Sequence, residues 1–163
     1  MIKKINKMVE SVLVFLLVSM LLVVIWQVLA RFLSQVMTVP ESSFTEELAS
    51  YLLIWLAMLG SAYVSGQSKH LAVDILQTKL NAKQNQKLSL VIQGLIILFS
   101  LAVMVFGGAK LVAFNAYFGQ TSASLGIPIA YVYSILPISG LLIIIYAIDS
   151  IIKNISSSTQ DLS

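Results

Sequence analysis

The sequence contains no cysteine, which excludes disulfide bonds, thiol redox chemistry and cysteine-ligated metal sites. Charge is also scarce: Asp, Glu, Lys and Arg make up 10% of the 163 residues, whereas a soluble domain typically carries about 25%. In contrast, 58% of the residues are hydrophobic and the mean hydropathy is +0.94. These proportions predict an integral membrane protein with the length of a single domain.

Four apolar runs are each long enough to cross a bilayer, which takes about 20 residues. They cover roughly residues 12–30, 48–66, 88–114 and 127–152. Each is expected to be a helix, because an open strand edge in lipid leaves its amide groups unpaired. The predicted fold class is therefore an all-α membrane protein, with one four-span domain over 1–155 and a polar tail over 156–163. Pro137 predicts a kink in the fourth run.

The distribution of lysines predicts the orientation, because cytoplasmic segments of membrane proteins carry an excess of Lys and Arg. Lysines precede the first run, occupy the segment between the second and third runs, and follow the fourth run: Lys3, Lys4, Lys7, Lys69, Lys79, Lys83, Lys87 and Lys153. The connection between the third and fourth runs carries no charge. Both termini are therefore expected on the cytoplasmic side, with the first and third connections facing outward.

The segment 70–87, between the second and third runs, shows a helical pattern. Leu71, Ile75 and Leu80 recur at helical spacing, while Lys79 points elsewhere. This pattern predicts a short amphipathic helix at the cytoplasmic surface. Such a helix either holds anionic lipid head groups through its lysines or serves as a strut against a partner protein.

No ionisable residue is expected at mid-depth in any run. Lys110 would lie about 33 Å along a helix that starts at Leu88, at a rise of about 1.5 Å per residue, and can therefore reach the outer boundary. The single histidine, His70, lies outside the runs, so an intramembrane haem ligand is missing. A proton-coupled exporter would need a carboxylate inside a span, and it is disfavoured because no run is expected to carry one at mid-depth. No phosphate-binding loop or catalytic constellation is visible, and we do not expect an enzyme.

Small residues follow one face of the second run. Ala57 and Ser61 are four positions apart, with Gly60 beside them. Small residues at this spacing let membrane helices approach closely. The contact is either within the bundle of this chain or with another membrane protein.

Several residues appear in a characteristic order along the chain. RF at 31–32 closes the first run, TEEL at 45–48 opens the second, Trp55 and Gly60 lie within it, and KHLAVDIL at 69–76 follows. This order resembles the small integral-membrane subunit of the tripartite ATP-independent periplasmic (TRAP) transporters, the DctQ family. The resemblance implies four spans and a heterodimer with a large multi-span subunit that holds the solute and sodium sites. It also implies that a periplasmic binding protein delivers a carboxylate solute, of the C4-dicarboxylate or sialic acid type.

The adjacent carboxylates Glu46 and Glu47 permit three interpretations. Their negative charges can interact favourably with the positive end of the helix dipole and set the depth of the second run. They can form an ion pair with Arg31, which lies at the same boundary. They can also contact the large subunit or the binding protein. His70 and Asp74 are one helical turn apart and permit two interpretations. They can form a hydrogen bond with each other, or they can be solvent-exposed residues at the start of a helix.

The favoured hypothesis is thus a non-catalytic small subunit in the inner membrane of a bacterium. It would brace the large subunit during sodium-coupled import and contact membrane lipids, without a cofactor or metal of its own and without a nucleic-acid partner. The alternative is a stand-alone homo-oligomeric channel or transporter, which would need a continuous polar lining. Residues Gln27, Gln93 and Ser100 do not supply such a lining on any one helix.

Overall fold

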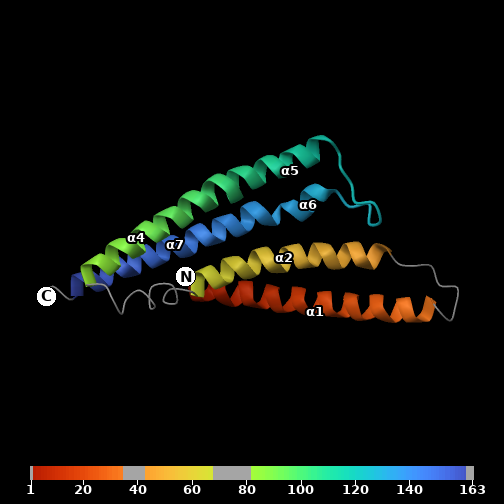
Figure 1. The fold of residues 1–163 in the computed structure, drawn as a ribbon, viewed down its shortest axis with the longest axis horizontal. Coiled ribbons are helices and arrows are strands. Elements are labelled where there is room, and N and C mark those ends of the chain that lie inside the picture. Colours follow the sequence, from red (N-terminus) through yellow and green to blue (C-terminus); the bar gives the residue numbers. More distant parts are fainter. Residues whose placement is uncertain (1, 35–42, 68–81, 161–163) are drawn as a thin grey trace. The chain divides into compact units, whose positions relative to one another are not determined.

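The computed structural model describes residues 2–34, 43–67 and 82–160, and its elements are helical (Figure 1). In chain order they are α1 (Ile2–Ser34), α2 (Ser43–Gln67), α4 (Ala82–Phe99), η1 (Ser100–Gly107), α5 (Gly108–Tyr117), α6 (Ile129–Tyr133) and α7 (Ile135–Gln160). The element η1 is a π-helix, so α4, η1 and α5 follow one another as one helical segment without a break. Residues 118–128, which we call loop 118–128, connect α5 to α6.

Four helical segments are long and apolar enough to cross a membrane, namely Ile2–Ser34, Ser43–Gln67, Lys87–Tyr117 and Ile129–Asn154. Each predicted apolar run falls on one of them, and the prediction of an all-α fold with four spans is confirmed. Within the described residues, β-structure is limited to an isolated bridge between Thr121 and Pro128. The helix α7 reaches Gln160, so it extends into the stretch that we predicted as a polar tail.

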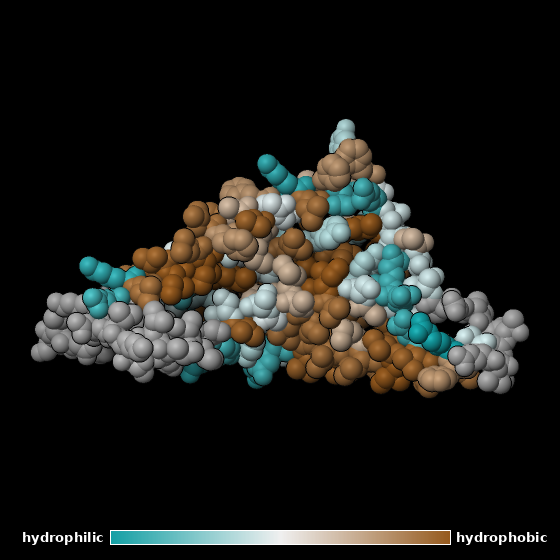
Figure 2. Space-filling model, viewed as in Figure 1, coloured by the Kyte–Doolittle hydropathy of each residue, from teal (hydrophilic) through white to brown (hydrophobic). Residues whose placement is uncertain are grey.

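Large apolar side chains are exposed along these helices, as expected of surfaces that face lipid. Phe15 on α1 is 70% exposed and Phe106 on η1 is 62% exposed. Figure 2 shows hydrophobic residues over much of the visible helical surface. The hydrophobic surface of the chain is therefore turned outward to a large extent, rather than collected in a core.

The chain divides into two compact units, which are described here separately. The first unit combines Met1–Gly60 with Lys110–Ile135 and contains α1, most of α2, most of α5, loop 118–128 and α6. Within it, α1 and α2 run side by side (Figure 1). A Cβ atom added at Gly60 would first meet Leu13 of α1 at 3.9 Å, an ordinary van der Waals distance. The contact of the two helices at Gly60 therefore leaves room for a side chain.

The second unit combines Ser61–Ala109 with Leu136–Ser163, and two of its helical elements approach closely at a glycine. A Cβ atom added at Gly140 of α7 would lie 2.8 Å from the Cβ of Met104 in η1. Ser139, the neighbour of Gly140, is fully buried, and Ser100 of η1 is 2% exposed. Small residues therefore allow α7 and the π-helix to approach closely, as is common between membrane helices.

The fourth span is interrupted between α6 and α7, at Ser134. Pro137 has no amide hydrogen, so it cannot donate to the carbonyl of Tyr133, one turn before it. The Ser134 hydroxyl donates to the carbonyl of Tyr131 at 2.6 Å. Pro137 thus marks the irregular part of this helix, as predicted, and the break itself lies three residues earlier.

Candidate functional site

Glu47, in the second turn of α2, connects this helix to loop 118–128. Its Oε2 atom accepts hydrogen bonds from the backbone N–H groups of Ser124 at 2.8 Å and Leu125 at 3.2 Å. Its Oε1 atom accepts the hydroxyl of Tyr51, one turn further along α2, at 2.7 Å. The Ser122 side chain also interacts with this carboxylate. Hydrogen bonds to an ionised acceptor are stronger than neutral ones, so Glu47 holds the loop firmly against α2.

The conformation of loop 118–128 explains why two of its amides point to one carboxylate. Ser122 accepts a hydrogen bond from the Leu125 amide through its hydroxyl and from the Gly126 amide through its carbonyl. Gly126 has φ of 65°, and Gly119 has φ of 59°, both in the left-handed region that glycine adopts without strain. Successive backbone N–H groups in such a turn form a concave anion-binding arrangement, and here the anion is the side chain of Glu47.

Trp55 makes the second long-range polar contact of the first unit. Its indole N–H donates to the backbone carbonyl of Val132 in α6 at 3.1 Å. Val132 is 6% exposed and lies just before the break in the fourth span. A carbonyl at a helix break inside a membrane needs an external donor, because water is absent there. Trp55 provides this donor, and it thereby links α2 to α6.

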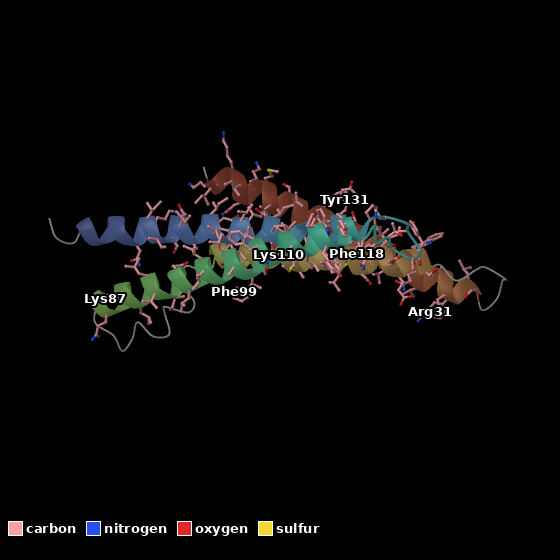
Figure 3. The ribbon with its side chains drawn as sticks, turned by 90° about the horizontal axis from the view of Figure 1, so that it is seen from above. Arg31, Lys87, Phe99, Lys110, Phe118 and Tyr131 are labelled. Atoms are coloured by element: carbon pink, nitrogen blue, oxygen red, sulfur yellow. The ribbon has the colours of Figure 1, made fainter. Side chains whose placement is uncertain are left out.

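Arg31 does not pair with either carboxylate. Within the described part of the chain, no ion pair joins Arg31 to Glu46 or Glu47, and Glu47 bonds to loop 118–128 and Tyr51 instead. Of the three interpretations of the acidic pair, an ion pair between Arg31 and Glu47 is therefore not formed in this structure, because Tyr51 and the loop amides bond to the Glu47 carboxylate. Arg31 lies in the last turn of α1 (Figure 3) and, with Glu46, lines a small pocket in the first unit.

The small residues predicted as a helix-packing face remain on the surface of the chain. Ala57 and Ser61 are exposed, and Gly60 has the room described above. Ala62 and Gly66 occupy the packed side of α2 in the second unit instead. Ala62 is fully buried, and a Cβ atom at Gly66 would lie 2.8 Å from the ring of Tyr146. The predicted face therefore lies on a different side of α2 from the face that packs within this chain.

The remaining predicted residues, His70 and Asp74, lie outside the described residues, as does most of the predicted amphipathic helix. Residues 82–87 of that segment belong to α4. Sequence reasoning did not identify the partners of Glu47 and Trp55. Those partners are mostly backbone atoms, which carry no signal of their own in a sequence. Gly119 and Gly126 around Ser122 were the available hint of a structured turn.

Comparison of the sequence with known proteins assigns the chain to a family. The family described as "Tripartite ATP-independent periplasmic transporters, DctQ component" matches residues 20–157, and the chain belongs to it. The chain is also similar to the sialic acid TRAP transporter small permease protein SiaQ of Vibrio cholerae serotype O1 (strain El Tor Inaba N16961). The two are 27% identical over 149 residues, which cover 91% of this chain and 82% of the relative.

These matches confirm the resemblance inferred from the residue order at 31–76. The protein is a small permease subunit of a TRAP transporter, and a family of this kind is a transport component, not an enzyme class. Together with the four apolar helices, the family places it in the inner membrane of a bacterium as a multi-pass protein.

Proposed function

We propose that this chain braces the large multi-span subunit of a TRAP transporter during sodium-coupled uptake of a carboxylate solute. In this proposal a periplasmic binding protein delivers the solute, and the large subunit alone holds the solute and the sodium ions. The family match over residues 20–157 is the observation that carries the proposal. The name of the V. cholerae relative favours a solute of the sialic acid type, and a C4-dicarboxylate is the other expected class.

The exposed face of α2 supports a bracing role. Leu53, Ala57, Ser61 and Val64 recur at three- and four-residue spacing along this helix, and all four are exposed. The small side chains of Ala57 and Ser61 leave a shallow strip between Leu53 and Val64. In lipid, strips of this kind favour close packing against another helix. We assign this face of α2 to the contact with the large subunit.

The fixed geometry of the first unit supports the same role. Glu47 ties loop 118–128 to α2, and Trp55 ties α6 to α2, so α2 is the common anchor of two other segments. A partner that docks on α2 would therefore contact an already ordered surface, which reduces the entropy lost on association.

The charges at the ends of the spans support an orientation with both termini in the cytoplasm. Lys87 opens the third span, and Lys153 near the end of the fourth span pairs with Asp149 at 2.7 Å. Loop 118–128 carries no charge. The excess of lysine at one set of ends favours the cytoplasmic side for them, and loop 118–128 then faces the periplasm together with Arg31 and Glu46.

Co-purification from native membranes in mild detergent tests the proposal. The tagged chain is expected to retain a large multi-span protein in a ratio near one to one, as identified by mass spectrometry. Isolation of the chain alone, or as a homo-oligomer, would contradict it. Ala57→Leu together with Ser61→Leu should release the large subunit, whereas Val12→Leu, on an exposed part of α1, should not.

Reconstitution in liposomes tests the division of labour between the subunits. The chain alone is expected to give no uptake of sialic acid or succinate under a sodium gradient. With the co-purified large subunit and its binding protein, uptake should appear and should require sodium. Sodium-driven uptake by the small chain alone would show that it transports by itself.

A further inference from the structure

A small pocket with two charged side chains in its lining lies between the C-terminal part of α1 and the first turn of α2. Its lining includes Gln27, Arg31 and Ser34 from α1, and Ser43 and Glu46 from α2. Within the described residues no ion pair joins Arg31 to Glu46, although both line this one pocket. A cation and an anion that share a pocket without pairing can bind a ligand with one charge of each sign. We call this site the Arg31–Glu46 pocket.

The Arg31–Glu46 pocket lies at the ends of two membrane spans. The helix α1 ends at Ser34 and α2 begins at Ser43, and both helices are long and apolar enough to cross a membrane, so we expect the pocket near the boundary of the apolar layer. Large apolar side chains next to the pocket are open to lipid: Phe32 is 64% exposed and Phe44 is 48% exposed. A molecule that enters the pocket from the bilayer thus meets charges at one end and apolar surface at the other.

We propose that the Arg31–Glu46 pocket binds the head group of a zwitterionic phospholipid that carries a primary ammonium, namely phosphatidylethanolamine. The guanidinium of Arg31 would hold the phosphate through paired N–H···O bonds, a geometry for which Arg is well suited. The carboxylate of Glu46 would accept hydrogen bonds from the ammonium, which two methylene groups connect to the phosphate. The hydroxyl of Ser43 and the amide of Gln27 are available to the remaining phosphate oxygens, whereas the Ser34 hydroxyl already donates to the Arg31 carbonyl at 2.8 Å. The acyl chains would lie along Phe32 and Phe44.

The chemistry of the pocket distinguishes this lipid from other common ones. The quaternary ammonium of phosphatidylcholine has no N–H group to donate to Glu46. Phosphatidylglycerol offers a phosphate to Arg31 but no cation to Glu46, which then remains beside an anion.

Lipid retention measured by native mass spectrometry tests this proposal. The full chain is placed in nanodiscs with equal amounts of phosphatidylethanolamine, phosphatidylcholine and phosphatidylglycerol, and the lipids that stay bound after release are identified. We expect about ten bound phosphatidylethanolamine molecules for each bound phosphatidylcholine, a ratio that corresponds to one additional charge-assisted hydrogen bond. Arg31→Gln and Glu46→Gln should each abolish this preference. Lys153→Gln, which removes a charge at the end of α7, should keep it.

Three outcomes would overturn the proposal. Equal retention of phosphatidylethanolamine and phosphatidylcholine would show that Glu46 does not distinguish a primary ammonium from a quaternary one. Preferential retention of phosphatidylglycerol would show a site for anions only. An unchanged preference in both glutamine variants would place the lipid elsewhere. Arg31 and Glu46 are exposed, and circular dichroism in the same nanodiscs would confirm that the variants keep their helical content. Because no partner subunit takes part, the result is independent of the proposed role in transport.

Discussion

The indole N–H of Trp55 donates to the backbone carbonyl of Val132 at 3.1 Å, across 77 positions of sequence. One side chain of the second span thus supplies the donor that a carbonyl of the fourth span needs next to its break. Trp55 is half-buried and Val132 is buried, so the bond lies where water cannot easily replace it.

Trp55→Phe is expected to lower the free energy of unfolding by about 1 kcal/mol, in the range found for single interhelical hydrogen bonds in membranes. Phenylalanine keeps most of the apolar contact but leaves the Val132 carbonyl without its donor. Thermal unfolding in detergent measures the loss. Trp26→Phe makes the same change at a side chain that is 59% exposed on α1, and its midpoint should stay near that of the wild type. Equal unfolding midpoints for the two variants would show that the bond from Trp55 to Val132 does not stabilise the protein.

Glu47→Gln is expected to loosen loop 118–128. The glutamine amide offers one good acceptor and places an NH₂ group toward the amides of Ser124 and Leu125, which then lose a charged partner. Hydrogen exchange of the peptides covering loop 118–128 should become about tenfold faster, because a bond to a charged group is lost. Glu46→Gln is the matched control, since Glu46 is the exposed neighbour of Glu47. Loop exchange at the wild-type rate in Glu47→Gln would show that the loop is held by other contacts.

Gly140→Ala is expected to destabilise the second unit by about 1–3 kcal/mol, as overpacking of a close contact usually does. The added Cβ atom would lie 2.8 Å from the Cβ of Met104 and 3.1 Å from the side chain of Val105. Gly94→Ala in α4 has nothing within 4 Å of its new atom. That variant should instead gain up to about 1 kcal/mol from the higher helix propensity of alanine. Thermal unfolding of both variants shows whether each is more or less stable than the wild type. A Gly140→Ala variant that is more stable would refute the close packing of α7 on η1.

The absence of cysteine makes the proposed orientation directly measurable, since every introduced thiol is the only one in the chain. Ala123→Cys in loop 118–128 and Lys87→Cys at the start of the third span are both exposed sites. A membrane-impermeant maleimide should label Ala123→Cys from the periplasmic side of intact cells, after the outer membrane is permeabilised. Lys87→Cys should react only after the inner membrane is broken. The reverse pattern would invert the topology.

The spans of this protein could be predicted from its sequence because apolar length is a direct physical requirement of the bilayer. Even the irregular fourth span was indicated, since Pro137 removes a donor wherever it stands. The partner of Glu47 could not be predicted in the same way. The carboxylate bonds to backbone amides that lie 77 and 78 positions further along the chain. Arg31 is a chemically plausible partner nearer in sequence, and charge matching alone could not decide between it and the other two interpretations of the acidic pair.

The small residues of α2 show a second limit of sequence reasoning. Ala57 and Ser61 have the spacing that favours helix contact, but Ala62 and Gly66 have it as well, on another side of the same helix. Only the ring of Tyr146, which lies against Gly66, identifies the side that packs within the chain. A sequence pattern can show that a helix has small faces, and the structure then shows which of them is already occupied.

The π-helix of Ser100–Gly107 changes how positions in the third span should be counted. Each turn closed by an i→i+5 bond takes up more residues than an α-turn of 3.6, so the chain rotates less per residue through this stretch. A helical wheel started at Leu88 with uniform steps therefore places Lys110 and Phe114 of α5 on the wrong side of the helix. When this span is aligned with a relative whose third span is α-helical throughout, a gap between Ser100 and Gly107 would restore the correspondence of outward-facing positions. Alignment without such a gap would pair lipid-facing residues of one protein with packed residues of the other.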